Sequence, residues 1–334
     1  MGARQNKPAS AKPRIFIDGE AGTTGLEIRE RLAALADVEV RRIEPAKRKD
    51  GKARQELMRE VDLVVLCLPD DAAREAVALA DELGADAPKI LDASTAHRVA
   101  LGWVYGFAEL DSHQAETISK ARRVANPGCY PTGAIAIVRP LVDAGMMPSD
   151  FPLTINAVSG YSGGGRKMIE AYEAGTAPSF ELYGLGLEHK HIPELVRYSK
   201  LTRRPILVPS VGNFRQGMVV SIPLHLDLLP GQPCLRDLEL ALDAHYRGSK
   251  LIGVAKDPGG SMTRLAAETL NDTDRLEIFV FGNATLRQAV LVARLDNLGK
   301  GAAGAAVQNI RLMLGLGADA GAKGQAREAS RVIP

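Results

Sequence analysis

The sequence predicts an α/β fold built in two parts, and three observations support this. Short apolar strands alternate with helical segments over the first third of the chain, a glycine-rich turn follows the first strand, and beyond Cys129 the strands are separated by long connections. Regular alternation is typical of a parallel sheet, and strands without intervening helices indicate a mixed or antiparallel one. We therefore expect a Rossmann-type domain followed by an α+β domain.

The first part follows this alternation closely. Short apolar runs indicate strands, and apolar residues at helical spacing indicate helices. The pattern predicts strands over residues 14–18, 38–43, 61–68 and 89–93, a strand ending at 122–125, and helices over residues 26–35 and 72–83. Such an order predicts a parallel sheet with right-handed crossovers.

The turn after the first strand has the pattern G-x-x-G-x-x-G and contains Gly19, Gly22, Thr23, Thr24 and Gly25. It is a looser form of the dinucleotide fingerprint, in which glycines let the backbone approach a pyrophosphate at a helix N-terminus. A structural turn is the alternative. Because this is the first strand-to-helix turn of an alternating chain, a dinucleotide site is favoured.

The residues after the second strand are expected to meet the adenosine ribose of that dinucleotide. Glu44 suits the free 2′-hydroxyl of NAD, whereas Lys47, Arg48 and Lys49 suit the 2′-phosphate of NADP. A solvated basic loop is the alternative for any one of them. Three cations outnumber one acid, so NADP(H) is the favoured cofactor.

Cys129 stands where a predicted strand meets a predicted helix. Pro127 and Gly128 force a turn, and residues 132–142 form an apolar helical run. A thiol near a helix N-terminus is expected to have a lowered pKa, and the free N–H groups there can hold an oxyanion. The alternative is a small apolar cysteine in a tight turn.

The second part is predicted to contain strands and a final helix. The strands cover residues 152–158, 206–209, 218–226, 275–282 and 288–295, and the helix covers 301–314. The glycine-rich segment 159–167 follows the first of these strands and is predicted to cradle a phosphate or carboxylate, with a linker as the alternative. Ser159 and Gly160 are predicted to contact the cofactor, and Arg166 is predicted to bind substrate.

His189 and His191 form the other cluster. On an extended segment they would share one side, which suits an acid/base partner for a thiol. A metal site is the rival interpretation, but no third ligand with suitable spacing is evident, so no metal is predicted.

Composition excludes several classes of protein. The 334 residues carry a net charge of +2, which argues against nucleic acid, and three separated cysteines suggest neither a disulfide framework nor a zinc knuckle, so a reducing cytoplasm is expected. No apolar run approaches the roughly 18 residues of a membrane span. Residues 1–12 and 318–334 are predicted to be flexible tails.

From about residue 13 to 316, the chain resembles the N-acetyl-gamma-glutamyl-phosphate reductases, in their short bacterial form, within the semialdehyde dehydrogenase superfamily. The resemblance rests on an ordered series of motifs: residues 17–25, 67–71, 92–98, 126–133, 158–165, 186–194 and 296–301. It implies a Rossmann-type dinucleotide-binding domain (13–128 with 297–316), an α+β catalytic and dimerisation domain (129–296), and a homo-oligomer, dimer or tetramer.

The resemblance also implies a reaction and its residues. The Cys129 thiolate would attack a small-molecule acyl phosphate and form a thioacyl enzyme, which NADPH reduces to the semialdehyde. His189 would be the acid/base, while His191 and Glu194 orient it or bind substrate. Two more residues of the pattern are Arg98, which would bind substrate, and Asn126, which would polarise the acyl oxygen. Asn297 would meet the nicotinamide carboxamide.

The chain departs from the longer form of the family at residues 94–98, which leaves substrate contacts there open. Three rivals remain: aspartate-semialdehyde dehydrogenase, the carrier-linked aminoadipyl-phosphate reductase, and a nucleotide-sensing protein without catalysis. The segment 189–194 argues against the first, the small net charge against the second, and the retained thiol and histidines against the third.

Overall fold

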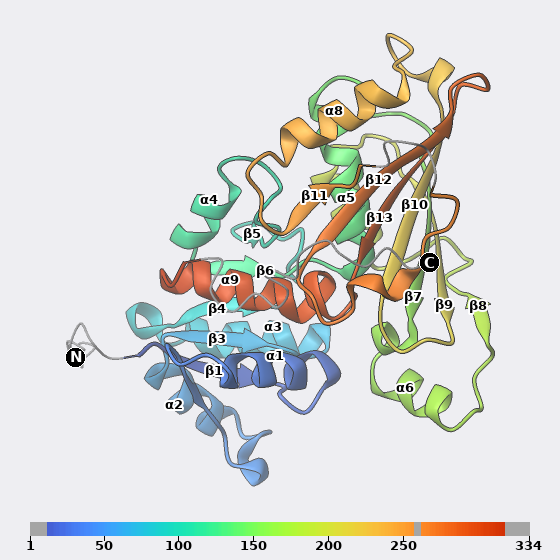
Figure 1. Cartoon of the computed structure of the whole chain (residues 1–334). Helices are drawn as coiled ribbons and strands as arrows, with labels where there is room; N and C mark the ends of the chain where they lie inside the picture. Colours follow the sequence, from blue (N-terminus) through green and yellow to red (C-terminus); the bar gives the residue numbers. More distant parts are fainter. Residues whose placement is uncertain (1–11, 257–261, 318–334) are drawn as a thin grey trace.

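The computed structural model describes residues 12–256 and 262–317, and these form two layered parts, each built around one sheet (Figure 1). The tails predicted over residues 1–12 and 318–334 lie almost wholly outside the described residues. Both predicted sheet types are confirmed, because the first sheet is parallel and the second is mixed.

The first sheet has the strand order β2-β1-β3-β4-β6-β5, and every pair in it is parallel. Its strands are β1 (Arg14–Asp18), β2 (Glu39–Arg41), β3 (Leu63–Leu66), β4 (Lys89–Asp92), β5 (Val104–Tyr105) and β6 (Arg123–Ala125). Side chains alternate across a strand. Ile15 and Ile17 therefore belong to one core cluster and Phe16 to the other, and a core forms on each face of the sheet.

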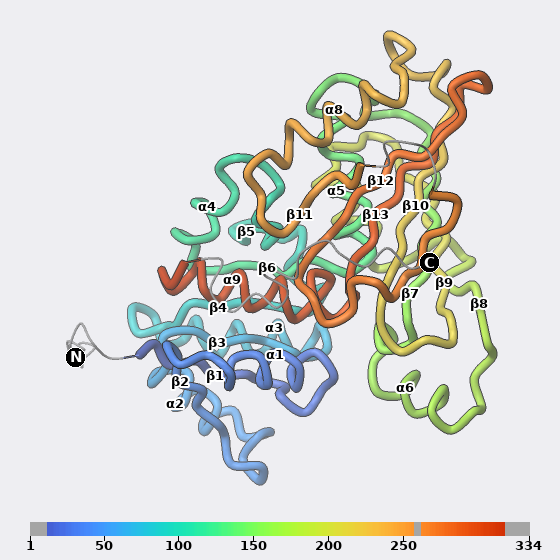
Figure 2. The backbone as a smooth tube through the Cα atoms, viewed as in Figure 1, coloured from blue at the N-terminus to red at the C-terminus, as the bar shows by residue number. Residues whose placement is uncertain are grey.

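Helices cover both faces of this sheet. One face packs against α1 (Thr23–Ala33), α4 (Gln114–Lys120) and the C-terminal α9 (Gly304–Leu314), and the other against α2 (Gly51–Glu60) and α3 (Asp70–Asp81). Figure 2 shows the red C-terminal segment lying beside the blue and cyan first part. Helices on both faces of a parallel sheet are the doubly wound arrangement of a Rossmann-type domain.

The second sheet has the order β11-β12-β13-β10-β7-β9-β8. Its strands are β7 (Thr154–Gly160), β8 (Phe180–Leu182), β9 (Ile206–Gly212), β10 (Met218–His225), β11 (Ile252–Val254), β12 (Leu276–Asn283) and β13 (Gln288–Leu295). The β7–β9 and β11–β12 pairs are parallel and the others antiparallel. The five strands predicted in this part are all present.

One face of the second sheet forms the larger core. It packs against α5 (Cys129–Asp143), α7 (Ile192–Tyr198) and α8 (Leu235–His245), while α6 (Arg166–Glu173) follows β7 and lies below the sheet in Figure 1. Helix α5 is buried along nearly its whole length, and its buried residues are almost all apolar or small. Its first residue is Cys129, so the core of the second part fixes the position of that thiol.

Two differences from the predicted elements bear on the site. The final helix does not start as an α-helix: residues Gly299–Ala303 form a π-helix, and α9 follows directly. His189 and His191 do not lie on an extended segment, because they occupy the turn that leads into α7. Pro193 stands in the first turn of that helix, where its missing N–H has no helical partner to lose.

Candidate active site

Cys129 lies at the carboxyl end of the first sheet and at the N-terminus of α5. Gly128 is the N-cap residue, with φ −78° and ψ 155°, and the helix begins at the cysteine itself. The thiol lines a pocket of about 320 Å³ with Arg98, His189 and His191. The structure thus brings together four of the predicted catalytic and substrate-binding residues.

The pKa of Cys129 differs from the sequence-based expectation. Burial raises the pKa of this thiol above its usual value, and it outweighs the backbone N–H groups at the helix start and the nearby Arg98, which lower it. The predicted lowering of the Cys129 pKa is therefore wrong for the free protein, because the free energy lost by dehydrating the thiolate exceeds the stabilisation from the helix N-terminus. A base must take the proton when the thiol reacts.

The two histidines are neighbours at the pocket wall. Their ring centroids are 4.7 Å apart, and the backbone N–H of His191 donates to Nδ1 of His189 at 3.2 Å. This bond favours the neutral tautomer of His189 with its proton on Nε2. Nδ1 of His191 is buried without a hydrogen-bond partner.

Burial is also the main cause that lowers the pKa of both rings, with Lys190 and Arg98 adding to it for His189. Both rings are therefore neutral at pH 7 and able to accept a proton. Tyr130 and Tyr183 flank His189, with ring centroids 5.9 and 5.7 Å away.

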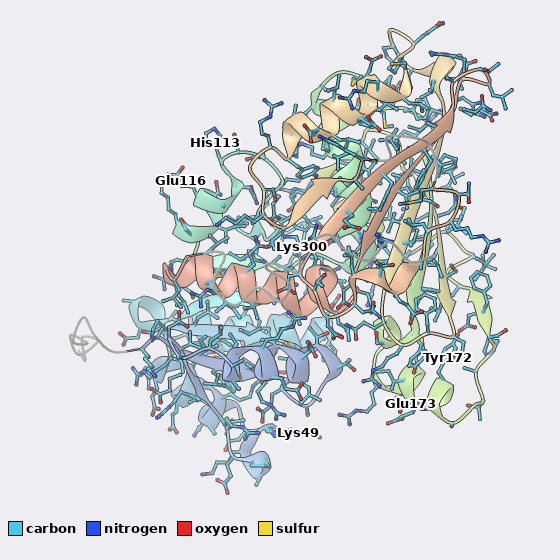
Figure 3. The ribbon with its side chains drawn as sticks, viewed as in Figure 1. Lys49, His113, Glu116, Tyr172, Glu173 and Lys300 are labelled. Carbon is cyan, nitrogen blue, oxygen red and sulfur yellow. The ribbon has the colours of Figure 1, made fainter. Side chains whose placement is uncertain are left out.

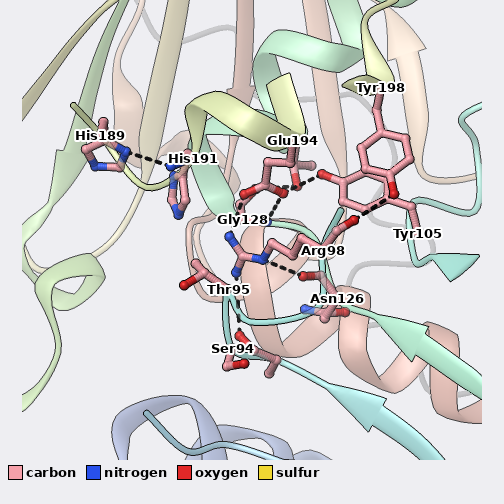
Figure 4. A network of polar contacts seen from close by, with 12 residues as sticks. Ser94, Thr95, Arg98, Tyr105, Asn126, Gly128, His189, His191, Glu194 and Tyr198 are labelled. Carbon is pink, nitrogen blue, oxygen red and sulfur yellow. Dashed lines mark hydrogen bonds and ion pairs between the residues drawn. The ribbon is translucent and has the colours of Figure 1, made fainter. Parts of the chain in front are cut away.

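Arg98 is held by a sealed network of charged and polar groups (Figure 4). Its Nη1 lies 2.5 Å from Oε1 of Glu194, and its Nε donates to the carbonyl of Asn126 at 3.0 Å. The other carboxylate oxygen of Glu194 accepts from the hydroxyl of Tyr105 at 2.7 Å and from the N–H of Gly128 at 3.1 Å. Glu194 is 1% exposed, so both of its oxygens are occupied inside the protein.

Gly128 is where this network meets the nucleophile. A Cβ at this position would lie 2.5 Å from Nη1 of Arg98, 2.7 Å from Nε2 of His191 and 2.8 Å from Oε1 of Glu194. Its φ is ordinary for any residue, so the requirement for glycine here is steric. The sequence indicated only a turn at Gly128, because its three neighbours come from distant segments.

Two asparagines connect the C-terminal segment to the pocket. Asn126 donates to the carbonyl of Ala302 at 3.0 Å and accepts from Asn309 at 3.0 Å. Asn297 donates to Ser162 at 2.9 Å and accepts from the N–H of Gly217 at 2.8 Å. Both side chains line the pocket. Their hydrogen bonds within the protein hold the π-helix against Cys129.

A buried lysine secures the same segment. Lys300, labelled near the centre of Figure 3, lies 2.6 Å from a carboxylate oxygen of Glu109 and donates to Gln308 at 2.8 Å. A Cβ on Gly301 would lie 3.1 Å from Cβ of Cys129, so the segment passes very close to the nucleophile.

The glycine-rich turn reaches the pocket from the first sheet. Gly19 has φ +91°, and a Cβ on Gly25 would lie 2.5 Å from the Gly19 carbonyl oxygen, so the turn needs glycine at both positions. Gly22 is the N-cap of α1, which begins at Thr23, earlier than predicted. Thr24 lines the pocket. The turn therefore has the tight form and helix N-terminus expected of a pyrophosphate site.

The second glycine-rich segment divides into two parts. Ser159 and Gly160 end β7 and line the pocket. Arg166 is exposed and is not among the residues lining the pocket; its guanidinium donates to the Ala21 carbonyl of the first turn. Arg166 thus connects the two glycine-rich segments.

The basic loop after β2 lies outside the pocket, and its two predicted cofactor residues have different partners. Lys47 lies 3.1 Å from the exposed Glu44, and Arg48 lies 2.8 Å from Glu20 in the glycine-rich turn.

Within residues 12–256 and 262–317, no group of three or more His, Cys, Asp or Glu side chains is placed to hold a metal ion. No helix of that same part of the chain is long and apolar enough to cross a bilayer.

Comparison with known proteins identifies the family. Residues 129–297 match the family model described as the semialdehyde dehydrogenase dimerisation domain. N-acetyl-gamma-glutamyl-phosphate reductases from Brucella ovis and Brucella suis are 52% identical over 310 residues, which cover 91% of this chain and 99% of theirs. The chain belongs to the N-acetyl-gamma-glutamyl-phosphate reductase family.

Solved structures show the same fold at low identity. Aspartate semialdehyde dehydrogenase II from Vibrio cholerae, complexed with ASA, has a TM-score of 0.68 at 14% identity over 91% of this chain and 99% of that one. Aspartate semialdehyde dehydrogenase from Candida albicans, with NADP, has a TM-score of 0.62 at 14% identity over 92% and 99%. The reductase family thus shares its fold with these dehydrogenases, and sequence separates them.

Aspartate-semialdehyde dehydrogenase and the aminoadipyl-phosphate reductase were alternatives within the same fold. Membership of the N-acetyl-gamma-glutamyl-phosphate reductase family decides against both. Sequence reasoning missed Tyr105, Tyr183 and Glu20, and it assigned Gly128 only to a turn. Of these, only Glu20 carried a local signal, because it is an acid inside a glycine-rich turn that is expected to hold an anionic pyrophosphate.

Proposed function

We propose that this chain catalyses the NADPH-dependent reduction of N-acetyl-L-glutamyl 5-phosphate to N-acetyl-L-glutamate 5-semialdehyde, with release of phosphate, in arginine biosynthesis. One observation carries the proposal: Cys129 begins a buried helix and shares a pocket with His189, His191 and Arg98 in a chain of this reductase family. A thiol, a neutral imidazole and a fixed guanidinium are the groups that acyl transfer from a phosphorylated carboxyl requires.

In the first half of the reaction, Sγ of Cys129 attacks the acyl carbon and phosphate leaves. A neutral imidazole accepts the thiol proton, and we assign this role to His189. Its bond to the His191 N–H is worth about 0.5–1.5 kcal/mol net. That is small beside a reaction barrier, so the ring can exchange tautomers and present either nitrogen.

Arg98 supports this half-reaction in two ways. Its charge lowers the pKa of Cys129, and its guanidinium faces the pocket in which the acyl phosphate would lie. We propose that Arg98 binds a phosphate or carboxylate of the substrate and that Glu194 fixes the guanidinium in position. Asn126 and the N–H groups at the start of α5 would face the acyl oxygen.

The residues of the glycine-rich turn fit a nicotinamide dinucleotide. Gly19, which has a positive φ, and the crowded Gly25 form a cradle that a Cβ would fill, at the N-terminus of α1. We propose that Gly19, Gly22, Thr23, Thr24 and Gly25 hold the pyrophosphate. When bound, NADPH supplies the hydride that reduces the thioester carbonyl.

Around the nicotinamide, we propose Ser159, Gly160 and Asn297 as contacts, since all three line the pocket with Cys129. His189, protonated by the Cys129 thiol in the first half, would donate that proton to the developing alkoxide oxygen. It would take the proton back as the thiohemiacetal collapses to the aldehyde, and pass it to the departing Cys129 thiolate. Arg166 would hold the two glycine-rich segments together across the cofactor.

We also propose the assembly of the protein. The dimerisation-domain family matches residues 129–297, which contain the second sheet, so we expect a homo-oligomer that joins through residues 129–296. Residues 13–128 with 297–316 would form the nucleotide-binding domain. Sedimentation of the full chain tests this, and a monomer at micromolar concentration would contradict it.

The decisive assay measures phosphate-dependent reduction of NADP⁺ by N-acetylglutamate semialdehyde and, separately, by aspartate semialdehyde. We expect turnover with the first aldehyde only, and none without phosphate. Preference for aspartate semialdehyde would replace the proposed substrate, and turnover without phosphate would contradict the acyl-phosphate chemistry.

A further inference from the structure

Glu20 is a buried carboxylate surrounded by arginines. It follows Gly19 in the glycine-rich turn, and its side chain is 7% exposed. Three guanidinium groups approach it: Nη2 of Arg48 at 2.8 Å, Nε of Arg42 at 3.4 Å and Nη1 of Arg29 at 4.0 Å. We call these four residues the Glu20 cluster. They come from the turn, from α1, from the end of β2 and from the loop beyond it.

The place of the Glu20 cluster in the fold points to a ligand. In a doubly wound domain, the adenosine ribose of a dinucleotide lies beside the end of the second strand, and the pyrophosphate lies at the first turn. The cluster joins these two places, because Arg42 follows β2 directly and Glu20 stands inside the turn.

The charges and exposures of the cluster match a phosphate monoester. Three guanidinium groups and one carboxylate leave a net charge of +2, and a phosphate monoester carries about −1.5 to −2 at pH 7. The side chains of Arg29, Arg42 and Arg48 are 31%, 60% and 39% exposed, so each has N–H groups available to a ligand. Both oxygens of Glu20 already face arginines, which leaves it poorly suited to accept a ribose hydroxyl.

Neighbouring charges do not compete for the same role. Lys47 lies beside Glu44, and both side chains are about 60% exposed, so their opposite charges neutralise each other at the surface. Figure 3 labels Lys49 on the outer loop after β2. Among these basic residues, Arg29, Arg42 and Arg48 are therefore the ones arranged around a buried carboxylate, that of Glu20.

We propose that Arg29, Arg42 and Arg48 form the subsite for the 2′-phosphate of NADP, with Glu20 as the positioning residue that holds the guanidinium groups together. This rests on the proposed function, which names the cofactor. It goes beyond that function by assigning specificity to a buried acid in the turn and to Arg29 and Arg42, and by assigning none to Lys47.

Calorimetric binding of NADP⁺ and NAD⁺ to the full-length protein tests the subsite without catalysis. We expect the wild type to prefer NADP⁺, and the double variant R42A/R48A to lose the preference by roughly tenfold or more while NAD⁺ affinity stays within about twofold. Lys47→Ala is the matched control, with unchanged preference. A double variant that keeps the wild-type preference overturns the subsite while leaving the proposed reaction intact.

The same measurement tests Glu20. Without its carboxylate the three guanidinium groups repel one another, so we expect Glu20→Gln to weaken NADP⁺ binding by about threefold to tenfold and to leave NAD⁺ unchanged. Tighter NADP⁺ binding would show that Glu20 only opposes the phosphate, and weaker NAD⁺ binding would make it a ribose ligand; either result overturns the positioning role. A wild type that prefers NAD⁺ would instead refute the cofactor of the proposed function and this subsite together.

Discussion

Two sites in this molecule combine one buried glutamate with arginine, and they differ in what surrounds the arginine. At the pocket, Arg98 and Glu194 are 9% and 1% exposed, and the protein supplies their hydrogen-bond partners. In the Glu20 cluster the carboxylate is also buried, at 7% exposed, but the arginines reach solvent. The first arrangement fixes a charge beside the nucleophile, and the second presents charge to a ligand that arrives from water.

The difference has an energetic consequence. Removing one partner of a sealed pair leaves an uncompensated buried charge, which is costly, whereas an exposed guanidinium is simply rehydrated. Substitutions at the pocket are therefore expected to change stability and chemistry together. Substitutions in the Glu20 cluster are expected to change mainly cofactor binding, with little effect on stability.

The largest expected effect is at the nucleophile. Cys129→Ser should reduce turnover by at least about 10⁴-fold, because a hydroxyl at neutral pH is a far poorer nucleophile than a thiolate. Thermal melting and NADP⁺ binding should stay close to wild type. Cys234→Ser is the matched control, since that thiol is exposed and free, and it should retain full activity. Substantial turnover in Cys129→Ser would contradict the thioacyl mechanism.

The next effect separates the histidines. His189→Asn should lower kcat by roughly 10²–10⁴-fold and remove one limb of the pH–rate profile, because proton transfer occurs only in the transition state. His191→Asn should act mainly on KM. If the pH profile is unchanged in His189→Asn and flattened in His191→Asn, the two assignments are exchanged, a result that the unpartnered Nδ1 of His191 would explain.

The two glutamates test the comparison directly. Glu194→Ala should lower the free energy of unfolding by about 3–5 kcal/mol, because it strands a buried guanidinium. Glu20→Ala should cost roughly 1 kcal/mol or less, because its arginines turn to solvent. Urea denaturation of both variants measures this. Equal losses would show that solvent exposure of the arginines does not distinguish the two sites.

Gly128→Ala probes the convergence of the sealed network on the nucleophile. The added methyl group would displace at least one of Arg98, His191 and Glu194, all within 2.8 Å of it. We expect kcat/KM to fall by about 10–100-fold with the fold retained, as for a small misplacement of positioned groups. Gly102→Ala is a contrasting control: its Cβ would meet nothing within 4 Å, although its φ of +79° adds local strain. Unchanged catalysis in Gly128→Ala would mean that the network is not needed in this geometry.

Local patterns in the sequence were sufficient to predict the two sheets and the position of the nucleophile. They were insufficient to predict the charge environment of the two sites. Strand periodicity and the strand-turn-helix pattern at Gly19 and Cys129 depend on residues that are neighbours in the sequence, so they could be predicted from it. The pKa of Cys129 depends on burial by distant segments. The Glu20 cluster likewise assembles from four segments, and along the chain Arg48 looks equivalent to Lys47. Only the fold shows that one is anchored and the other is paired at the surface.

The smallest expected effect is a pH dependence of stability at the sealed site. Burial keeps the pKa of His191 well below 6.5 in the folded chain, while the unfolded chain binds a proton near that pH. The unfolded state therefore binds more protons as pH falls below about 6.5, and stability falls by up to about 1.4 kcal/mol per pH unit on this account. Denaturant unfolding of the wild type and of His191→Asn between pH 5 and pH 7.5 measures the contribution of His191 to this pH dependence. The variant should show a shallower slope, and an identical slope in both proteins would mean that burial does not lower the pKa of the His191 ring in the folded chain.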